Sequence, residues 1–156
     1  MIKHGATTIW ELWNGNTADP LMNSGNHVML LGDFLPWIFC DVAGIREGLP
    51  GFERIVLRPH FVFDSVECSH RSPRGRIASS WTKNGDGTIR WTVEIPPGTP
   101  ACAELPASAV VVSQETGATV AGAETFQSPE GDLVRITLPP GSSAFEIRTK
   151  ARNPNP

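Results

Sequence analysis

The sequence predicts a mainly β protein in which a short helical segment precedes an antiparallel β-sandwich. The chain of 156 residues contains 15 Gly and 14 Pro, which interrupt it more often than a helical bundle allows. After residue 52, apolar and polar residues alternate over short stretches, and this period of two is typical of half-buried strands. The sequence Asn-Gly-Asp-Gly at 84–87 separates two such stretches and is the strongest hairpin signal in the chain.

We expect the helical segment at residues 26–42. The Asn-Ser-Gly-Asn sequence at 23–26 is a start signal, and Gly44 favours an end. Pro36 should kink the helix, because proline lacks a backbone N–H and crowds the preceding turn. Further apolar residues lie outside the main stripe, so the helix needs neighbours on several sides. The stripe, at spacings of three and four, comprises Val28, Leu31, Leu35, Phe39 and Val42.

Residues 45–52 are expected to form a linker, since Gly48, Pro50 and Gly51 break any regular pattern. Strands are expected beyond the linker, because short alternating stretches follow one another with turn residues between them, as in a sandwich. Their expected ranges are 55–58, 61–70, 76–83 and 88–95, with further strands near 101–105, 110–113, 133–138 and 144–149.

Charge and hydropathy exclude several kinds of partner. The net charge is -3 and the pI about 5.8, and no basic cluster is present to neutralise phosphates. We therefore expect no nucleic acid and no membrane partner. The longest apolar stretch, residues 28–42, is broken by Gly32, Asp33 and Pro36 and is too interrupted to span a bilayer. The first residues lack the charged region and apolar run of a signal peptide.

The cysteines and histidines show no metal-binding spacing. Three widely spaced cysteines argue against a disulfide framework or a zinc ribbon, and their apolar neighbours predict buried free thiols. We expect neither a metal nor a cofactor. The residues concerned are Cys40, Cys68, Cys102, His4, His60 and His70.

The strongest candidate for a catalytic residue is Glu11, which lies between Trp10 and Trp13 in the sequence. Aromatic surface desolvates a neighbouring carboxyl and can stack on the apolar face of a sugar ring. Glycoside hydrolysis needs two carboxyls flanking the bond, and neither Asp19 nor Asp33 has the setting of a catalytic acid. Glu11 is thus predicted to be half of a glycosidase site. The alternative is structural, since Thr8 and Glu11 have the spacing of a helix capping box.

Two further polar features have open interpretations. His27 lies at the expected start of the helix, where its imidazole could hydrogen-bond sugar hydroxyls or serve as a local cap or core histidine. Arg71, Arg74 and Arg76 crowd one turn, which favours surface salt bridges or a docking surface over anion binding.

Five motifs in a fixed order are specific as a set. Residues 5–13 are Gly-Ala-Thr-Thr-Ile-Trp-Glu-Leu-Trp, and residues 22–27 are Met-Asn-Ser-Gly-Asn-His. Val-Ala-Gly-Ile-Arg follows at 42–46, then Pro-Gly-Phe at 50–52 with Leu-Arg-Pro at 57–59, and Ser-Pro at 72–73 with Gly-Arg-Ile at 75–77. Together they resemble the bacterial α-L-rhamnosidases of glycoside hydrolase family 78. The likeness covers residues 5–81.

The resemblance implies an (α/α)6 barrel followed by a carboxyl-terminal β-sandwich. Residues 1–47 would be the last piece of the barrel, 48–150 the sandwich and 151–156 a disordered tail. It also implies release of terminal α-L-rhamnose with inversion and without a cofactor. Glu11 would be the general base, His27 would contact the sugar, and Trp10 and Trp13 would line its pocket.

The sequence lacks the upstream barrel helices and the general acid of that family. We therefore expect a carboxyl-terminal fragment that is inactive alone and whose partners are a rhamnosylated glycoside and the upstream barrel domain. The apolar helix would otherwise be exposed, so self-association as a homodimer is also expected. The alternative from another class is a non-catalytic β-sandwich, accessory or structural, that docks on a partner domain.

Overall fold

The computed structural model describes residues 1–12, 14–17, 19, 21, 27, 29 and 31–148. Backbone contacts divide the chain into two compact units, Met1–Trp37 and Ile38–Pro156. The first unit begins with a 3-10 turn, η1 (Ile2–His4), which ends at Gly5 with a φ of 77°. It closes with the helix α1 (Leu31–Pro36).

The helix changes its winding directly after Pro36. α1 continues as a π-helical segment, η3 (Trp37–Val42), and the N–H of Ala43 donates to the carbonyl of Ile38, five residues back. A proline cannot donate to the carbonyl four residues back, so the regular α-helical bonding is interrupted there. The predicted helix therefore exists from Leu31 and ends at Val42 as expected. Its predicted first residue, Asn26, lies outside the described residues, but His27 is described and is not helical, so the helix was predicted to begin too early.

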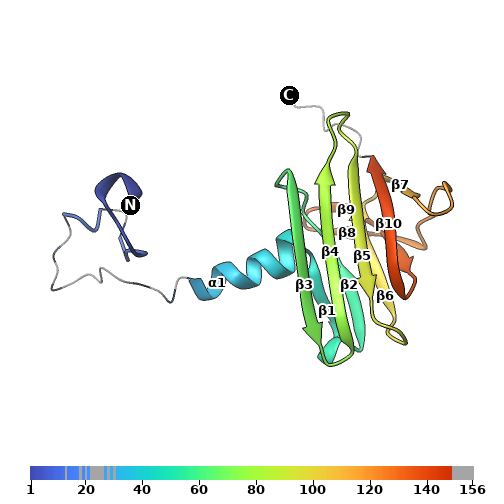
Figure 1. The fold of residues 1–156 in the computed structure, drawn as a ribbon, viewed down its shortest axis with the longest axis horizontal. Coiled ribbons are helices and arrows are strands. Elements are labelled where there is room, and N and C mark those ends of the chain that lie inside the picture. The colour runs from blue at the N-terminus through green and yellow to red at the C-terminus, as the bar shows by residue number, and fades with distance from the viewer. Residues whose placement is uncertain are drawn as a thin grey trace. The chain divides into compact units, whose positions relative to one another are not determined.

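The second unit is a β-sandwich of two five-stranded sheets, which Figure 1 shows packed face to face. The first sheet has the order β1-β2-β6-β9-β8, formed by Ile45–Leu49, Arg54–Leu57, Ala101–Pro106, Gly131–Leu138 and Glu124–Ser128. The second has the order β3-β4-β5-β10-β7, formed by Ser65–Ser72, Gly75–Lys83, Ile89–Ile95, Gly141–Arg148 and Val110–Ser113. A 3-10 turn, η4 (Pro50–Phe52), joins β1 to β2.

The pairing confirms the predicted antiparallel sandwich, and β2 with β6 is the one parallel pair between these strands. The predicted hairpin joins β4 to β5. The N–H of Asn84 donates to the carbonyl of Thr88, and Gly87 has a φ of 81°. The carboxylate of Asp86 accepts hydrogen bonds from the backbone N–H and from the hydroxyl of Thr88. These two bonds lower the pKa of Asp86, and the backbone bond has the larger effect.

Three further sequence expectations are wrong. Residues 45–49 form β1 rather than a linker, because Ile45 and Leu57 pair across the sheet. Strand β8 has too weak an alternation to be found from the sequence, and β9 supplies its register. Cys40 is exposed, since its helix is exposed on several sides, whereas Cys102 is buried and Cys68 half-buried.

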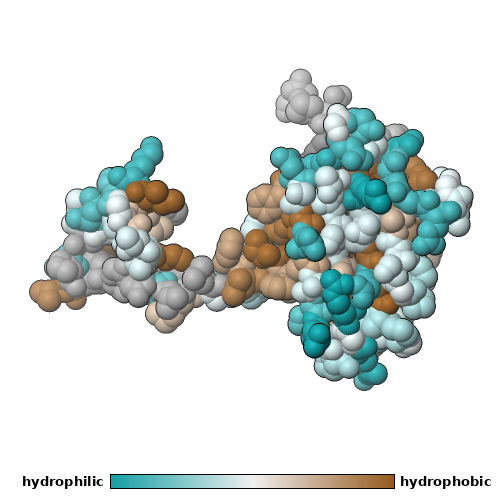
Figure 2. All heavy atoms as spheres, viewed as in Figure 1, coloured by the Kyte–Doolittle hydropathy of each residue, from teal (hydrophilic) through white to brown (hydrophobic). Residues whose placement is uncertain are grey.

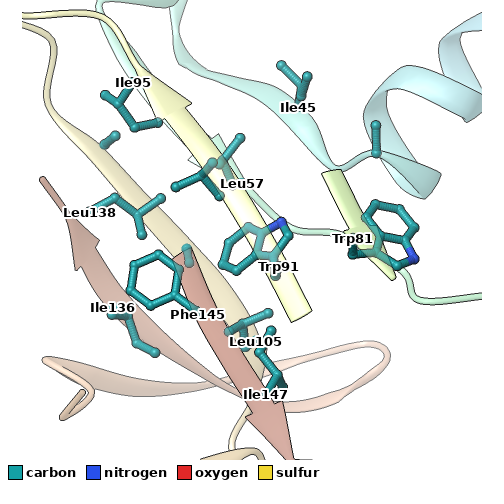
Figure 3. Packing of buried hydrophobic residues seen from close by; sticks show 14 of the residues in the cluster. Ile45, Leu57, Trp81, Trp91, Ile95, Leu105, Ile136, Leu138, Phe145 and Ile147 are labelled. Carbon is teal, nitrogen blue, oxygen red and sulfur yellow. The ribbon is translucent and has the colours of Figure 1, made fainter. Parts of the chain in front are cut away.

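The core is filled by side chains from both sheets. Figure 3 shows Trp91 of β5 among Leu57 and Leu105 of the first sheet and Phe145 of β10. The rings of Trp91 and Phe145 lie 5.8 Å apart between centroids. Trp91 is wholly buried, and its indole Nε1 donates to the hydroxyl of Ser79, also wholly buried, over 3.1 Å. The core thus contains a polar pair in which the indole N–H is satisfied.

Replacing Ser79 with Ala should destabilise the sandwich by about 1–3 kcal/mol, because the indole N–H of Trp91 is left buried without an acceptor. Urea unfolding followed by Trp fluorescence measures the change. Ser80→Ala is the matched control, since Ser80 follows in β4 and faces the opposite side of the sheet. It should change stability by about 0.5 kcal/mol or less. Equal effects of the two changes would contradict the assigned role of Ser79.

Residues at the end of η3 connect the helix to the sandwich. Arg46 of β1 donates from Nε to the carbonyl of Cys40 and from a terminal nitrogen to the carboxylate of Asp41. The N–H of His60 donates to the carbonyls of Asp41 and Val42. The carbonyls at a helix end lack partners within the helix, so these bonds satisfy them. Gly44 follows with a φ of 75°, and its carbonyl accepts from Arg58 N–H over 2.8 Å.

Gly44→Ala should be far more costly than Gly87→Ala. Both glycines have positive φ, which costs an L-residue about 1–2 kcal/mol. A Cβ at Gly44 would also collide with the backbone of Arg58 and Pro59, whereas a Cβ at Gly87 meets nothing within 4 Å. We expect a loss of about 3 kcal/mol or more at Gly44. Thermal melts of both variants test this, and similar melting temperatures would refute the close approach at Gly44.

The segment formed by α1 and the first residue of η3 exposes large apolar side chains. Phe34, Leu35 and Trp37 are 50%, 56% and 41% exposed, and Figure 2 shows the brown surface that covers this helix. The rings of Phe34 and Trp37 stack at a tilt, with centroids 5.9 Å apart. In the described part of the chain, no helix is long and apolar enough to cross a membrane.

Candidate functional site

The stretch that contains Glu11 is a loop. Thr7, Thr8, Glu11 and Leu12 lie in bends, and residues 14–17 form turns. The N–H of Gly15 donates to the carbonyl of Leu12 over 3.2 Å. No helix begins within residues 5–12 or 14–17, so the interpretation of Glu11 as part of a helix capping box is wrong.

The structure brings Glu11 and His27 together, although sixteen positions separate them in the sequence. The backbone N–H of His27 donates to the carbonyl of Ile9 over 2.6 Å, which places His27 beside the loop. Its Nδ1 then lies 3.7 Å from Oε2 of Glu11. This is too long for a direct hydrogen bond. The two predicted site residues are therefore neighbours through a backbone contact that sequence reasoning could not place.

Burial differs between the two groups. The side chain of Glu11 is 40% exposed and that of His27 25% exposed. Nδ1 of His27 is itself buried and lacks a hydrogen-bond partner. A buried polar atom without a hydrogen-bond partner lowers stability, so such atoms are rare and are often explained by a functional role. Nδ1 of His27 is thus directed at the carboxylate while still able to form a hydrogen bond.

Trp10 is half-buried beside this pair. Its backbone N–H donates to the sulfur of Met1 over 3.3 Å. A Cβ added at Gly15 would come within 2.7 Å of the indole ring, so Gly15 lies directly against the ring of Trp10. Glycine is needed at position 15 for space, not for a positive φ. Trp13, the other predicted pocket residue, lies outside the described residues.

A second polar cluster lies on the sandwich. Arg135 bonds Glu104 at 2.8 Å, and Arg58 bonds Glu130 at 2.8 Å. The hydrogen bond from His60, followed by those from Arg58, lowers the pKa of Glu130, and the bond to Glu104 raises the pKa of Arg135. These residues come from four separate segments, which explains why the sequence did not reveal the cluster. Every member has an oppositely charged partner, so the arrangement is that of a structural network.

A hollow of about 700 Å³ lies against β2, β6 and β9. Arg54, Cys102 and Thr137 line it, and none of the predicted site residues does. Burial raises the pKa of the Cys102 thiol, as it does for Cys68. A thiol with a raised pKa remains protonated and is a poor nucleophile. The described residues also include no cluster of three His, Cys, Asp or Glu side chains able to hold a metal.

Two family models match the chain in succession. Residues 1–42 match the bacterial alpha-L-rhamnosidase 6 hairpin glycosidase domain, and residues 44–119 match the bacterial alpha-L-rhamnosidase C-terminal domain. The chain belongs to the bacterial α-L-rhamnosidase family. This confirms the resemblance that the motifs indicated. The order of the two models relates the chain to the carboxyl-terminal part of such enzymes.

Curated rhamnosidases are similar over most of this chain but are far longer. An alpha-L-rhamnosidase of Streptomyces avermitilis is 32% identical over 130 residues, which are 79% of this chain and 12% of that protein. An alpha-L-rhamnosidase of Alteromonas sp. is 34% identical over 93 residues, which are 55% of this chain and 10% of that protein. An alpha-L-rhamnosidase of Formosa agariphila is 29% identical over 157 residues, which cover 94% of this chain and 17% of that protein. The chain therefore spans less than a fifth of these relatives.

Solved rhamnosidases share the fold. The enzyme from Dictyoglumus thermophilum matches with a TM-score of 0.70 and 26% identity, over 96% of this chain and 17% of its own. The Streptomyces avermitilis enzyme, solved with L-rhamnose, matches with a TM-score of 0.66 and 25% identity, over 94% and 14% respectively. The mainly β fold predicted from the sequence is thus found at corresponding positions in much larger rhamnosidases.

Proposed function

We propose that this chain contributes part of the active site of an inverting hydrolase that releases terminal α-L-rhamnose, with Glu11 as the general base. The observation that supports the proposal is the pairing of Glu11 with His27 at 3.7 Å in a loop beside Trp10. These residues occupy the motifs on which the family resemblance rests. Glu11 and His27 provide an acceptor of protons and a hydrogen-bonding imidazole in one place, and Trp10, which precedes Glu11 in the chain, provides aromatic surface.

Inversion requires a base on one face of the sugar and an acid on the other. The base removes a proton from water as it attacks the anomeric carbon, while the acid protonates the departing oxygen. Glu11, partly exposed, would be accessible to that water. One carboxylate cannot act on both faces, so the acid belongs to residues outside these 156. The remaining barrel domain is the partner that would supply it.

His27 would orient both the base and the sugar. With Nδ1 directed toward Glu11, a modest closure on substrate binding would form a hydrogen bond, since catalytic bonds are often long before substrate enters. The other ring nitrogen, Nε2, would then bind a sugar hydroxyl. Trp10 and Trp13 would form an apolar wall suited to the C6 methyl group of rhamnose, and Gly15 leaves room for the indole ring of Trp10.

The 156-residue chain alone should not hydrolyse an aryl α-L-rhamnoside, because the proposed general acid is absent from it. The measurement is release of 4-nitrophenol by the purified chain at increasing enzyme concentration. The matched sample is the Glu11→Gln variant, which should give the same background. Turnover by the native chain that disappears in Glu11→Gln would refute the proposed division of the site.

The role of Glu11 can be tested in a chimaera in which this chain replaces the corresponding segment of the Streptomyces avermitilis relative. Glu11→Ala should lower kcat by about 10²–10⁴-fold, which is the usual contribution of a general base. Added azide should restore turnover, because it attacks without deprotonation. The expected product is the β-L-rhamnosyl azide, identified by NMR.

Asp19→Asn is the matched control in this chimaera, since Asp19 is the next acid in the sequence and accepts a bond from Leu21 N–H. It should leave kcat within a few-fold of the unmodified chimaera. Full activity of Glu11→Ala, or a rescued azide product of retained α configuration, would show that Glu11 is not the base of an inverting reaction.

A further inference from the structure

Strand β3 (Ser65–Ser72) forms one margin of its sheet, as Figure 1 shows in green. Within the described part of the chain it pairs with β4 alone. All eight residues pair in one continuous register, from Ser65 opposite Thr82 to Ser72 opposite Gly75, without a bulge. A straight edge strand of this length presents a row of backbone groups that another strand can bind.

The hairpin geometry determines which backbone groups face outward. Two residues, Pro73 and Arg74, connect β3 to β4, so Ser72 and Gly75 form the closing hydrogen-bonded pair. Hydrogen-bonded and non-bonded pairs alternate along an antiparallel ladder. Ser72 and every second residue before it therefore bond to β4. The N–H and C=O groups of Glu67, Ser69 and Arg71 are directed to the open side.

The side chains of these same three residues are exposed. Arg71 lies opposite Arg76, whose guanidinium pairs instead with Glu94 of β5. Glu67 lies opposite Ser80. In the described structure neither Glu67 nor Arg71 forms an ion pair, whereas Arg74 in the adjoining turn pairs with Glu53. The edge thus presents one acid and one base without charged partners.

The two charges are symmetric about Ser69, with Glu67 two positions before it and Arg71 two positions after it. If two copies of β3 pair antiparallel about Ser69, Glu67 of each copy lies directly opposite Arg71 of the other. This register allows backbone hydrogen bonds between the copies, since Glu67, Ser69 and Arg71 all direct their N–H and C=O groups to the open side. The adjacent permitted register would place Glu67 opposite Ser69 and Arg71 opposite Ser65, without any ion pair.

We infer that two copies of this chain dimerise through β3, paired antiparallel about Ser69, so that the two five-stranded sheets become continuous. About six backbone hydrogen bonds would form from Glu67, Ser69 and Arg71 of the two copies. Two Glu67–Arg71 pairs would add to them, because opposite charges directly across a ladder are favourable. Charge complementarity identifies a second copy as the partner.

The inner side of β3 is already occupied, so pairing requires no rearrangement. Val66 and Cys68 pack against the core, and the His70 ring contacts the rings of Phe39 and Phe52. The His70 ring centroid is 5.1 Å from that of Phe52 and 6.4 Å from that of Phe39. These contacts keep β3 extended before a partner binds. Association would then cost little ordering of the strand.

Charge reversal tests the register. Glu67→Arg and Arg71→Glu should each raise the dimer dissociation constant of the 156-residue chain at least tenfold in sedimentation velocity, because each creates two like-charge contacts per dimer. A mixture of the two variants should form a heterodimer, since one variant then has two positive charges at positions 67 and 71 and the other has two negative charges there. Asp132→Arg is the matched control and should leave the dissociation constant unchanged, since Asp132 is exposed and belongs to β9 of the other sheet.

A cross-link tests the centre of symmetry. In a Cys40→Ser background, Ser69→Cys should form an intermolecular disulfide, since Cα atoms of a bonded pair lie about 5.5 Å apart. Glu67→Cys should not, because its two copies would be more than about 10 Å apart. A monomeric native chain would overturn the inference. A dimer that resists both charge reversals would do so too, and would assign association to another surface such as exposed α1.

Discussion

The close approach of the backbone at Gly44 to that at Arg58 and Pro59 is the constraint on which the sandwich depends. It lets β1 begin immediately after the helix and sets the register in which Ile45 faces Leu57. β2, fixed in this way, pairs with β6 on its other side and so starts the first sheet. A side chain at position 44 would separate the helix end from the strands and displace the edge of that sheet.

Features determined by local sequence could be predicted. The hairpin at 84–87 needs only its own turn residues, and the end of the helix at Val42 was indicated by Gly44, two residues later. Strand β1 could not be predicted, because its five residues, with Gly48 inside and Pro50 directly after, become a strand only through pairing with β2. The network around Glu104 and Arg135 was missed for the same reason, since its members meet only after the sheets form.

The candidate site was predicted in part. The motifs named Glu11, His27 and Trp10, and the structure places the first two within 3.7 Å. What local pattern misjudged was the backbone around Glu11, which forms bends instead of a helix start. The bond from His27 to Ile9 joins residues distant in sequence, and no propensity scale contains such a contact. Gly15 does lie in a turn, as its residue type favours, but its φ is not positive and its lack of a side chain leaves room for an indole ring.

The parallel pair between β2 and β6 has a consequence for how the chain folds. β3, β4 and β5 follow one another as antiparallel neighbours and can assemble through short loops. β2 must wait for β6, which is synthesised only after all three of them. The first sheet therefore closes late, through contacts of high sequence separation, and this closure is the slow step of a sandwich. Until then β1 and β2 can form only a two-stranded ribbon, which is marginally stable by itself in water.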